Sequence, residues 1–141
     1  MGKLRIDSEY RRALHDESTE GGLLLSTSDT RDWYVSGTYR VMNRLAVGSY
    51  YSRYTITVVS GGPLAPRVPD QTDTSLPGNH VYDKVVTARV DLNRFWDVKA
   101  EGHFMNGYGF GPYPDGFYLQ DNPQGFAQNT SALVVKTGFN F

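Results

Sequence analysis

Hydrophobic and polar residues alternate along most of the chain, with a period of two that is typical of β-strands with two unlike faces. In residues 131–141, for example, the odd positions carry Leu133, Val135 and Phe139, whereas an even position carries Lys136. The same alternation predicts six strands, at residues 3–12, 31–41, 45–58, 82–92, 96–104 and 131–141. The predicted fold class is therefore all-β, an antiparallel meander of about six strands.

The alternation assigns each residue to a face in five of these strands but leaves one strand open. In residues 45–58 the apolar face could be formed by Leu45 and Val47 or by Ala46 and Tyr50, because aromatic and aliphatic residues occupy both sets of positions. Such a strand has apolar groups on both sides. Its register has to be decided by its neighbours rather than by its own pattern.

The predicted connections between strands differ in length. Three of them are long, polar or rich in Gly and Pro, and are predicted loops: residues 13–29, with room for a short strand at 23–25, residues 60–80 and residues 106–130. Two are tight turns, at residues 42–44 and 93–95. Long and short connections then alternate, so all the long ones lie at one end of the sheet, as in outer-membrane barrels.

Composition is compatible with a membrane β-barrel and excludes a helical membrane protein. The 141 residues carry 14 basic and 15 acidic side chains, the mean hydropathy is −0.47, and no apolar run approaches the length of about 20 residues that a transmembrane helix needs. The 10 Tyr, 7 Phe and 15 Gly suit a barrel and a soluble β-protein equally. Because the net charge is only −1, no nucleic-acid partner is expected.

The sequence offers little support for catalysis or for metal binding. Its three histidines, His15, His80 and His103, lack the spacing of metal ligands, and no residue near His103 in the sequence is marked as a catalytic partner. The absence of Cys excludes disulfides and thiolate sites. We expect no catalytic residue, no cofactor and no metal, and the chain is not expected to be an enzyme.

The polar faces of the predicted strands carry twelve charges of balanced sign. They are Arg5, Arg11, Arg40, Arg89, Lys99 and Lys136 against Asp7, Glu9, Asp83, Asp91, Asp97 and Glu101. Uncompensated buried charges are costly, so this face needs water, either outside a soluble sheet or inside a channel. The candidate lumen-lining residues are Arg40, Arg89, Asp91, Lys99, Glu101 and Lys136.

Aromatic residues fall near the ends of the predicted apolar faces. One level contains Tyr10, Trp33, Tyr82, Phe104 and Tyr108, and the other contains Trp96, Phe139 and Phe141. Aromatic girdles at both interfaces mark membrane barrels. The candidate membrane-interface aromatics are Trp33, Tyr82, Trp96, Phe104, Phe139 and Phe141.

Five stretches resemble bacterial outer-membrane porins. Residues 131–141 resemble the closing strand of these barrels, in which a terminal Phe is habitual. Residues 33–40 and 43–54 look like a hairpin of large porins, and residues 83–93 with 98–101 are similar to the penultimate hairpin of the same proteins, including the phosphate-selective type. The resemblance implies a channel in the bacterial outer membrane, with passive diffusion of small hydrophilic solutes or ions. The lipid bilayer and these solutes are then its partners.

The predicted strand number is smaller than that of a complete barrel. Bacterial single-chain barrels have at least about eight strands. We therefore expect residues 1–141 to be one segment from the C-terminal region of a larger barrel, without its signal peptide. The remaining strands of that barrel are expected partners, and further copies of the chain are considered as well. The sheet is expected to be open and curved, with residues 3–12 and 131–141 at its edges and the charged face on the concave side.

The alternative is a soluble β-sandwich or β-barrel binding module, for example one that binds carbohydrate on aromatic loops. Both readings place the charged face in water, so the apolar face distinguishes them. A soluble module must cover this face with a second sheet, whereas a membrane barrel exposes it to lipid. The residues that decide are Val86, Ala88, Val90, Val98 and Ala100.

Overall fold

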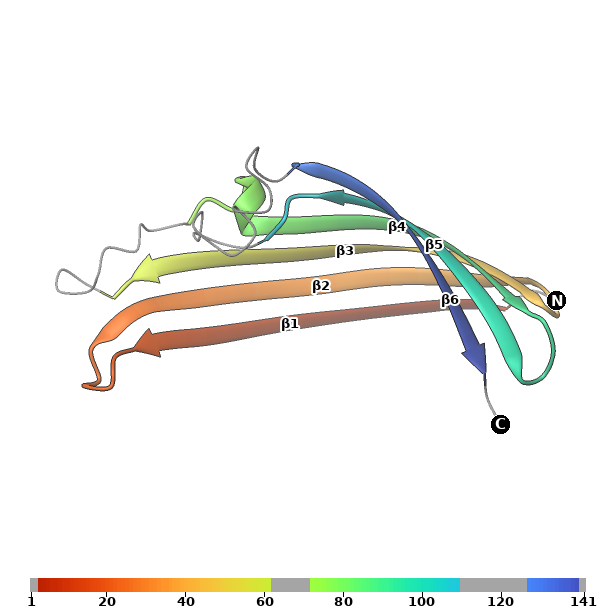
Figure 1. Ribbon diagram of the computed structural model, residues 1–141, viewed down its shortest axis with the longest axis horizontal. Coiled ribbons are helices and arrows are strands. Elements are labelled where there is room, and N and C mark those ends of the chain that lie inside the picture. Colours follow the sequence, from red (N-terminus) through yellow and green to blue (C-terminus); the bar gives the residue numbers. More distant parts are fainter. Residues whose placement is uncertain (1–2, 62–71, 110–126, 140–141) are drawn as a thin grey trace.

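The six strands form one antiparallel sheet in which each strand is hydrogen-bonded to the next along the chain (Figure 1). The computed structural model describes residues 3–61, 72–109 and 127–139. The strands are β1 (Leu4–Ser18), β2 (Leu24–Met42), β3 (Leu45–Ser60), β4 (His80–Asp91), β5 (Trp96–Asn106) and β6 (Asn129–Phe139), and a short 3-10 helix, η1 (Pro77–Asn79), precedes β4. The predicted all-β antiparallel meander is confirmed. No helix in these ranges has the length and apolar character needed to cross a lipid bilayer.

Two tight turns lie where the sequence predicted them. Asn43 and Arg44 join β2 to β3, and the register between these strands shifts just before this turn. Between β4 and β5, the side-chain oxygen of Asn93 accepts the backbone N–H groups of Phe95 and Trp96 at 2.8 and 3.0 Å. An Asn side chain that bonds its own following backbone fixes such a turn locally.

The prediction of a long loop at residues 13–29 was wrong. β1 and β2 continue to pair through this region, from Ala13 opposite Thr30 to Ser18 opposite Leu24. Their connection is a short turn in which Thr19 and Leu23 are hydrogen-bonded and Gly22 has a φ of 78°. The alternation of long and short connections is therefore broken at this first connection.

This longer hairpin is polar on both sides, which explains the error. Its side chains are mostly exposed on β1 and include no continuous apolar row. Backbone hydrogen bonds between antiparallel strands hold it together, and these do not depend on side-chain type. Alternation of polarity therefore cannot reveal a strand that has water on both faces.

The register places the apolar residues of neighbouring strands side by side. Val47 of β3 lies opposite Ala88, which lies opposite Ala100, which lies opposite Val135 of β6. Because directly opposed residues share a face, this settles the open register of β3. Val47 belongs to the apolar face, and Tyr50 to the charged one.

The apolar face is not covered by any other part of the described chain. Val86 is 57% exposed, Phe104 is 56% exposed, and Val90 and Leu133 are exposed as well. Figure 1 shows a single layer, with β5 and β6 twisted across the direction of β1, β2 and β3. The residues that were to decide between the two readings do not pack against a second sheet within the described ranges.

The buried side chains of the central strands lie on the opposite, charged face. They include Val85, Asp83 and Glu101. In a single-layer sheet, side chains become buried where a bend brings neighbours together, so the charged face is the concave one. At the two edges, no ladder pairs β1 with β6 within the described residues, which confirms the predicted open sheet.

Candidate functional site

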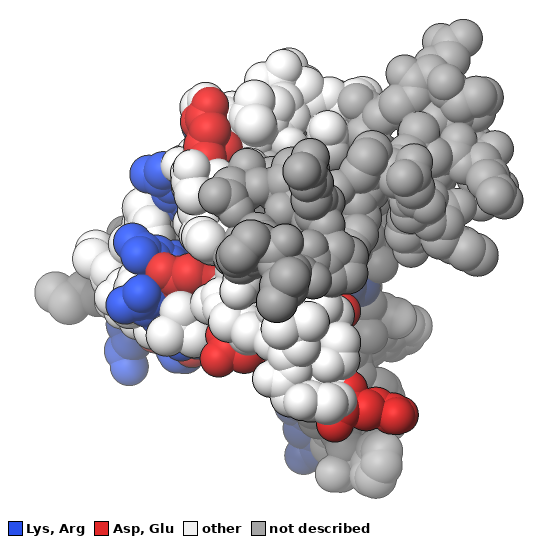
Figure 2. All heavy atoms as spheres, turned by 90° about the vertical axis from the view of Figure 1, so that its left-hand side faces the viewer, with Lys and Arg blue, Asp and Glu red and all other residues white. Residues whose placement is uncertain are grey.

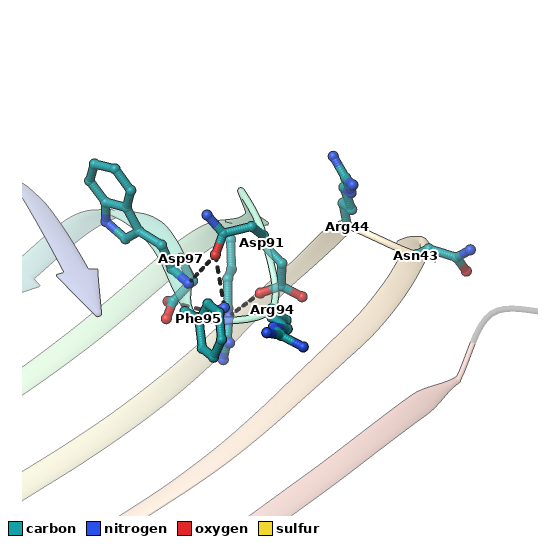
Figure 3. Close-up of a pocket in the computed structure, with 9 residues that line it drawn as sticks. Asn43, Arg44, Asp91, Arg94, Phe95 and Asp97 are labelled. Atoms are coloured by element: carbon teal, nitrogen blue, oxygen red, sulfur yellow. Dashed lines mark hydrogen bonds and ion pairs between the residues drawn. The ribbon is translucent and has the colours of Figure 1, made fainter. Parts of the chain in front are cut away.

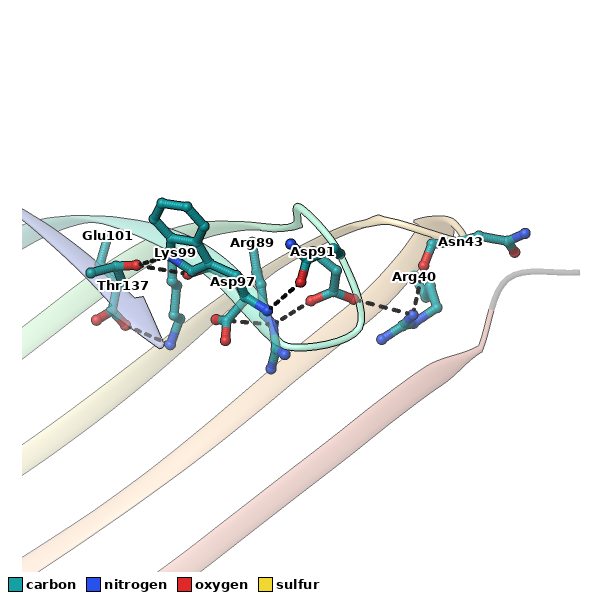
Figure 4. Close-up of polar contacts among 10 residues, drawn as sticks. Arg40, Asn43, Arg89, Asp91, Asp97, Lys99, Glu101 and Thr137 are labelled. Atoms are coloured by element: carbon teal, nitrogen blue, oxygen red, sulfur yellow. Dashed lines mark hydrogen bonds and ion pairs between the residues drawn. The ribbon is translucent and has the colours of Figure 1, made fainter. Parts of the chain in front are cut away.

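The charged face is organised around a row of cations that crosses the sheet (Figure 4). In the register, Arg89 lies opposite Lys99, and Lys99 lies opposite Lys136. Arg40 occupies the same row on β2, separated from Arg89 by Ala46 of β3. Like charges placed directly opposite each other destabilise a sheet, so this row depends on nearby acids.

Two aspartates neutralise the arginine end of the row. Asp91 accepts Arg89 Nε at 2.9 Å and lies 3.5 Å from Arg40 Nη1, and Asp97 lies 3.4 Å from Arg89 Nε. Arg40 also donates to the backbone carbonyl of Asn43 at 2.9 Å, which ties it to the β2–β3 turn. The arginines are thus held in place by the turns at this end of the sheet.

A polar pocket of about 380 Å³ opens beside the β4–β5 turn (Figure 3). Arg89, Asp91 and Asp97 line it together with residues of the two turns, among them Arg94. The Arg94 guanidinium lies over the Phe95 ring, 4.3 Å from its centre. The pocket combines both signs of charge, so it is suited to hydrated ions or small polar solutes rather than to one strongly charged ligand.

Glu101 neutralises the lysine end of the row. Its residue is only 3% exposed, and its carboxylate accepts Lys99 Nζ at 2.8 Å and Lys136 Nζ at 2.5 Å. One acid therefore bridges two lysines that face each other across β5 and β6. A buried carboxylate is stable in its ionised form only with such partners.

A second cluster on this face escaped the sequence analysis. His103 Nδ1 and Asp83 Oδ2 lie 2.7 Å apart, and the Tyr50 ring meets the His103 ring edge-on with centres 6.2 Å apart. The partner of His103 lies diagonally across the β4–β5 ladder, a relation that only the register reveals. No hydroxyl group of a described residue is hydrogen-bonded to His103, so the pair lacks the nucleophile of a catalytic triad.

No metal site is formed by the part of the chain that the structure describes. Three or more His, Asp or Glu side chains do not converge anywhere in residues 3–61, 72–109 and 127–139. His80, the second predicted loop histidine, begins β4 and is buried, with Asn106 Oδ1 2.9 Å from its Nε2. Its contacts are those of a structural side chain.

The aromatic residues lie on the other, apolar face at two levels. At one level Tyr10, Trp33, Arg53 and Tyr82 occupy one cross-strand row, in which the Arg53 guanidinium lies 5.0 Å from the centre of the Tyr82 ring. The Trp33 and Tyr51 rings meet edge-on at 5.4 Å.

At the other level Trp96 lies opposite Phe139, whose ring centre is 6.4 Å from that of Phe95. Phe104 sits on the same face, in the register row next to that of Tyr82. Phe141, the last of the six candidate interface aromatics, lies outside the described residues. The five that the structure describes are thus divided between the two ends of the apolar face.

All six candidate lumen-lining residues share one face and one network of ion pairs, as predicted. Their placement follows from the chain's own register and charges. The porin resemblance remains an expectation from the sequence. Comparison with models of protein families, with curated proteins and with solved structures finds no match to the chain.

Proposed function

We propose that the chain forms part of the wall of a porin-like β-barrel in the bacterial outer membrane. Small hydrophilic solutes or ions would cross the membrane passively through its lumen. The observation that carries the proposal is the contrast between the two faces of a single-layer sheet. One face is apolar, uncovered and bounded by aromatics, and the other is filled with ion pairs. A bilayer outside and water inside satisfy both faces.

The apolar face has a suitable length for a membrane. On β5 it extends from Trp96 to Phe104, a span of nine residues. A transmembrane β-strand needs about 9–11 residues because strands cross the bilayer at a tilt. The aromatic residues at both ends of this span would then lie at the two interfaces, where Trp and Tyr are enriched.

The charged face would line the lumen and set its field. Four cations form the row of Arg40, Arg89, Lys99 and Lys136, and Asp91, Asp97 and Glu101 lie against them. Fixed charges in a narrow aqueous passage attract or repel passing ions. Because each cation here has an acidic neighbour, we expect this part of the wall to favour neither sign strongly.

The alternative, a soluble carbohydrate-binding module, requires a layer that covers the apolar face. The described residues supply no such layer, and Val86 and Phe104 are more than half exposed. Exposed apolar surface of this extent makes a soluble monomer prone to association. We therefore favour the membrane function.

The direct test is reconstitution of the full-length barrel in planar lipid bilayers. We expect stepwise conductance and a reversal potential near zero under a salt gradient. A protein that stays soluble without detergent and ignores lipid vesicles would contradict the membrane assignment. Strong anion selectivity that Arg89→Ala abolishes would instead contradict the balanced lumen.

A further inference from the structure

A cluster of two arginines and one aspartate lies on the apolar side of the long β1–β2 hairpin. Arg12 of β1 is directly opposite Arg31 of β2. Both guanidinium groups bind Asp29. Arg12 donates to its two oxygens at 2.9 Å each, and Arg31 donates to Oδ2 from Nε at 3.2 Å and from Nη2 at 2.7 Å. The carboxylate thus holds two like charges side by side.

The cluster has unused capacity for an anion. It carries one net positive charge, and the side chains of Arg12 and Arg31 are 49% and 55% exposed while that of Asp29 is 15% exposed. A guanidinium has five N–H groups in a planar fork, and each arginine uses two of them on Asp29. The remaining donors suit the oxygens of a phosphate group.

The position of the cluster relative to the aromatic level is specific. Tyr10 and Trp33 face each other two residues before Arg12 and two residues after Arg31, so all four side chains share one face. Two residues correspond to about 7 Å along a strand. Arg53 lies in the aromatic row itself, over the Tyr82 ring.

Basic side chains are visible at this end of the sheet in the space-filling view. Figure 2 faces the end at which the β1–β2 turn lies, and Lys and Arg gather along one side of the molecule with an acidic side chain among them. Arg11, the sequence neighbour of Arg12, points to the opposite face, where it binds Asp32 at 2.9 Å. Adjacent arginines therefore serve two different surfaces.

We propose that Arg12 and Arg31, held by Asp29, bind the phosphate of a phosphorylated lipid headgroup at the outer surface of the barrel wall. The inference rests on the proposed membrane function. Aromatic side chains of a membrane protein lie at the level of the headgroups, so groups just beyond them meet the phosphates. Guanidinium groups at that depth would select phosphate-rich lipids over zwitterionic ones.

Fluorescence quenching by brominated lipid tests this next to the site. The full chain carries Trp96→Phe, which leaves Trp33 as the one tryptophan, and is placed in phosphatidylcholine bilayers that contain a small fraction of brominated phosphatidic acid. A net charge of one corresponds to an enrichment of about fivefold at the site. We expect that enrichment around Trp33, and a fall to about one or below in the variant Arg12→Gln/Arg31→Gln.

A matched control removes the same charge from the same hairpin but from its other face. Arg5→Gln/Arg11→Gln should leave the enrichment around Trp33 unchanged. Equal enrichment in the Arg12→Gln/Arg31→Gln variant, or equal loss in the control, would overturn the proposal. Persistence of the enrichment in a tenfold excess of inorganic phosphate supports a lipid ligand, and its disappearance there would show a site for free anions instead.

The experiment separates this inference from the function on which it rests. Brominated phosphatidylcholine in the same bilayers reports whether Trp33 meets lipid at all. Quenching by it without preference for phosphatidic acid keeps the membrane function and refutes the phosphate site. Absence of quenching by either lipid refutes the membrane placement itself.

Discussion

Replacement of Glu101 by Gln should destabilise the sheet by about 1–2 kcal/mol. The change leaves Lys99 and Lys136 directly opposite each other without the acid between them. At a separation of about 6 Å, two positive charges repel by about 3 kcal/mol at an effective dielectric constant of about 20 and by about 0.7 kcal/mol in water. The lysine side chains are 37% and 61% exposed, which places the cost between these limits.

Urea unfolding of the chain in detergent micelles, followed by tryptophan fluorescence, measures this cost. Glu9→Gln is the control, because Glu9 lies on the same face of β1, is exposed, and forms no ion pair with any residue that the structure describes. Its change in the free energy of unfolding should stay within about 0.5 kcal/mol.

A second variant separates lost charge balance from lost packing. Glu101→Gln/Lys136→Gln removes the repulsion together with the acid, so it should recover most of the stability lost in Glu101→Gln. The reasoning is refuted if Glu101→Gln unfolds at the same urea concentration as the parent. It is also refuted if the double variant is less stable than Glu101→Gln.

Three further predictions concern other parts of the sheet. Ala88→Arg, in the middle of the apolar face, should lower the stability of the chain in lipid vesicles by about 2–4 kcal/mol, whereas Thr87→Arg on the charged face should cost less than about 1 kcal/mol; equal effects in a urea titration would contradict the assignment of faces. Hydrogen bonds from its two arginines lower the pKa of Asp29 from 3.8 to about 2, so the stabilisation by its ionised form is complete above about pH 4 and disappears as the pH falls through 2; a carboxyl ¹³C NMR titration with a midpoint near 3.8 would exclude this. A Cβ at Gly48 would lie 2.6 Å from the carbonyl oxygen of Gly37, whereas a Cβ at Gly37 would meet no atom within 4 Å; Gly48→Ala should therefore cost about 1–3 kcal/mol in thermal unfolding and Gly37→Ala little, and the reverse order would contradict the close approach of the two strands.

Sequence alone was sufficient for the central part of the sheet. Residues such as Val86, Ala88 and Lys99 lie where water or apolar surroundings differ between the two faces, so their alternation records the face directly. The ion-pair partners were not predictable in the same way. Asp83 with His103 is a diagonal pair across two strands, and only the register defines it.

The long hairpin and the arginine cluster were missed for a common reason. Residues 13–30 are polar on both faces, and the sequence pattern carries no contrast from which a strand could be recognised. Once they were assigned to a loop, Asp29 could not be placed between Arg12 and Arg31, which lie 19 positions apart in the sequence but opposite each other in the ladder. The open register of β3 had the opposite cause, because apolar groups occur on both of its faces.

The nested pairing of β1 with β2 also sets the order in which the sheet assembles. These strands close around the short turn from Thr19 to Leu23, and each new pair forms next to an existing one, so zippering requires no further loop closure. β2 with β3 and β4 with β5 can form in the same local way. The pairing of β3 with β4 must first bring together ends separated by residues 61–79, and that of β5 with β6 ends separated by residues 107–128. Because loop closure carries an entropic cost that local pairs avoid, β1, β2 and β3 should acquire protection from hydrogen exchange as one early unit, before β6 is added.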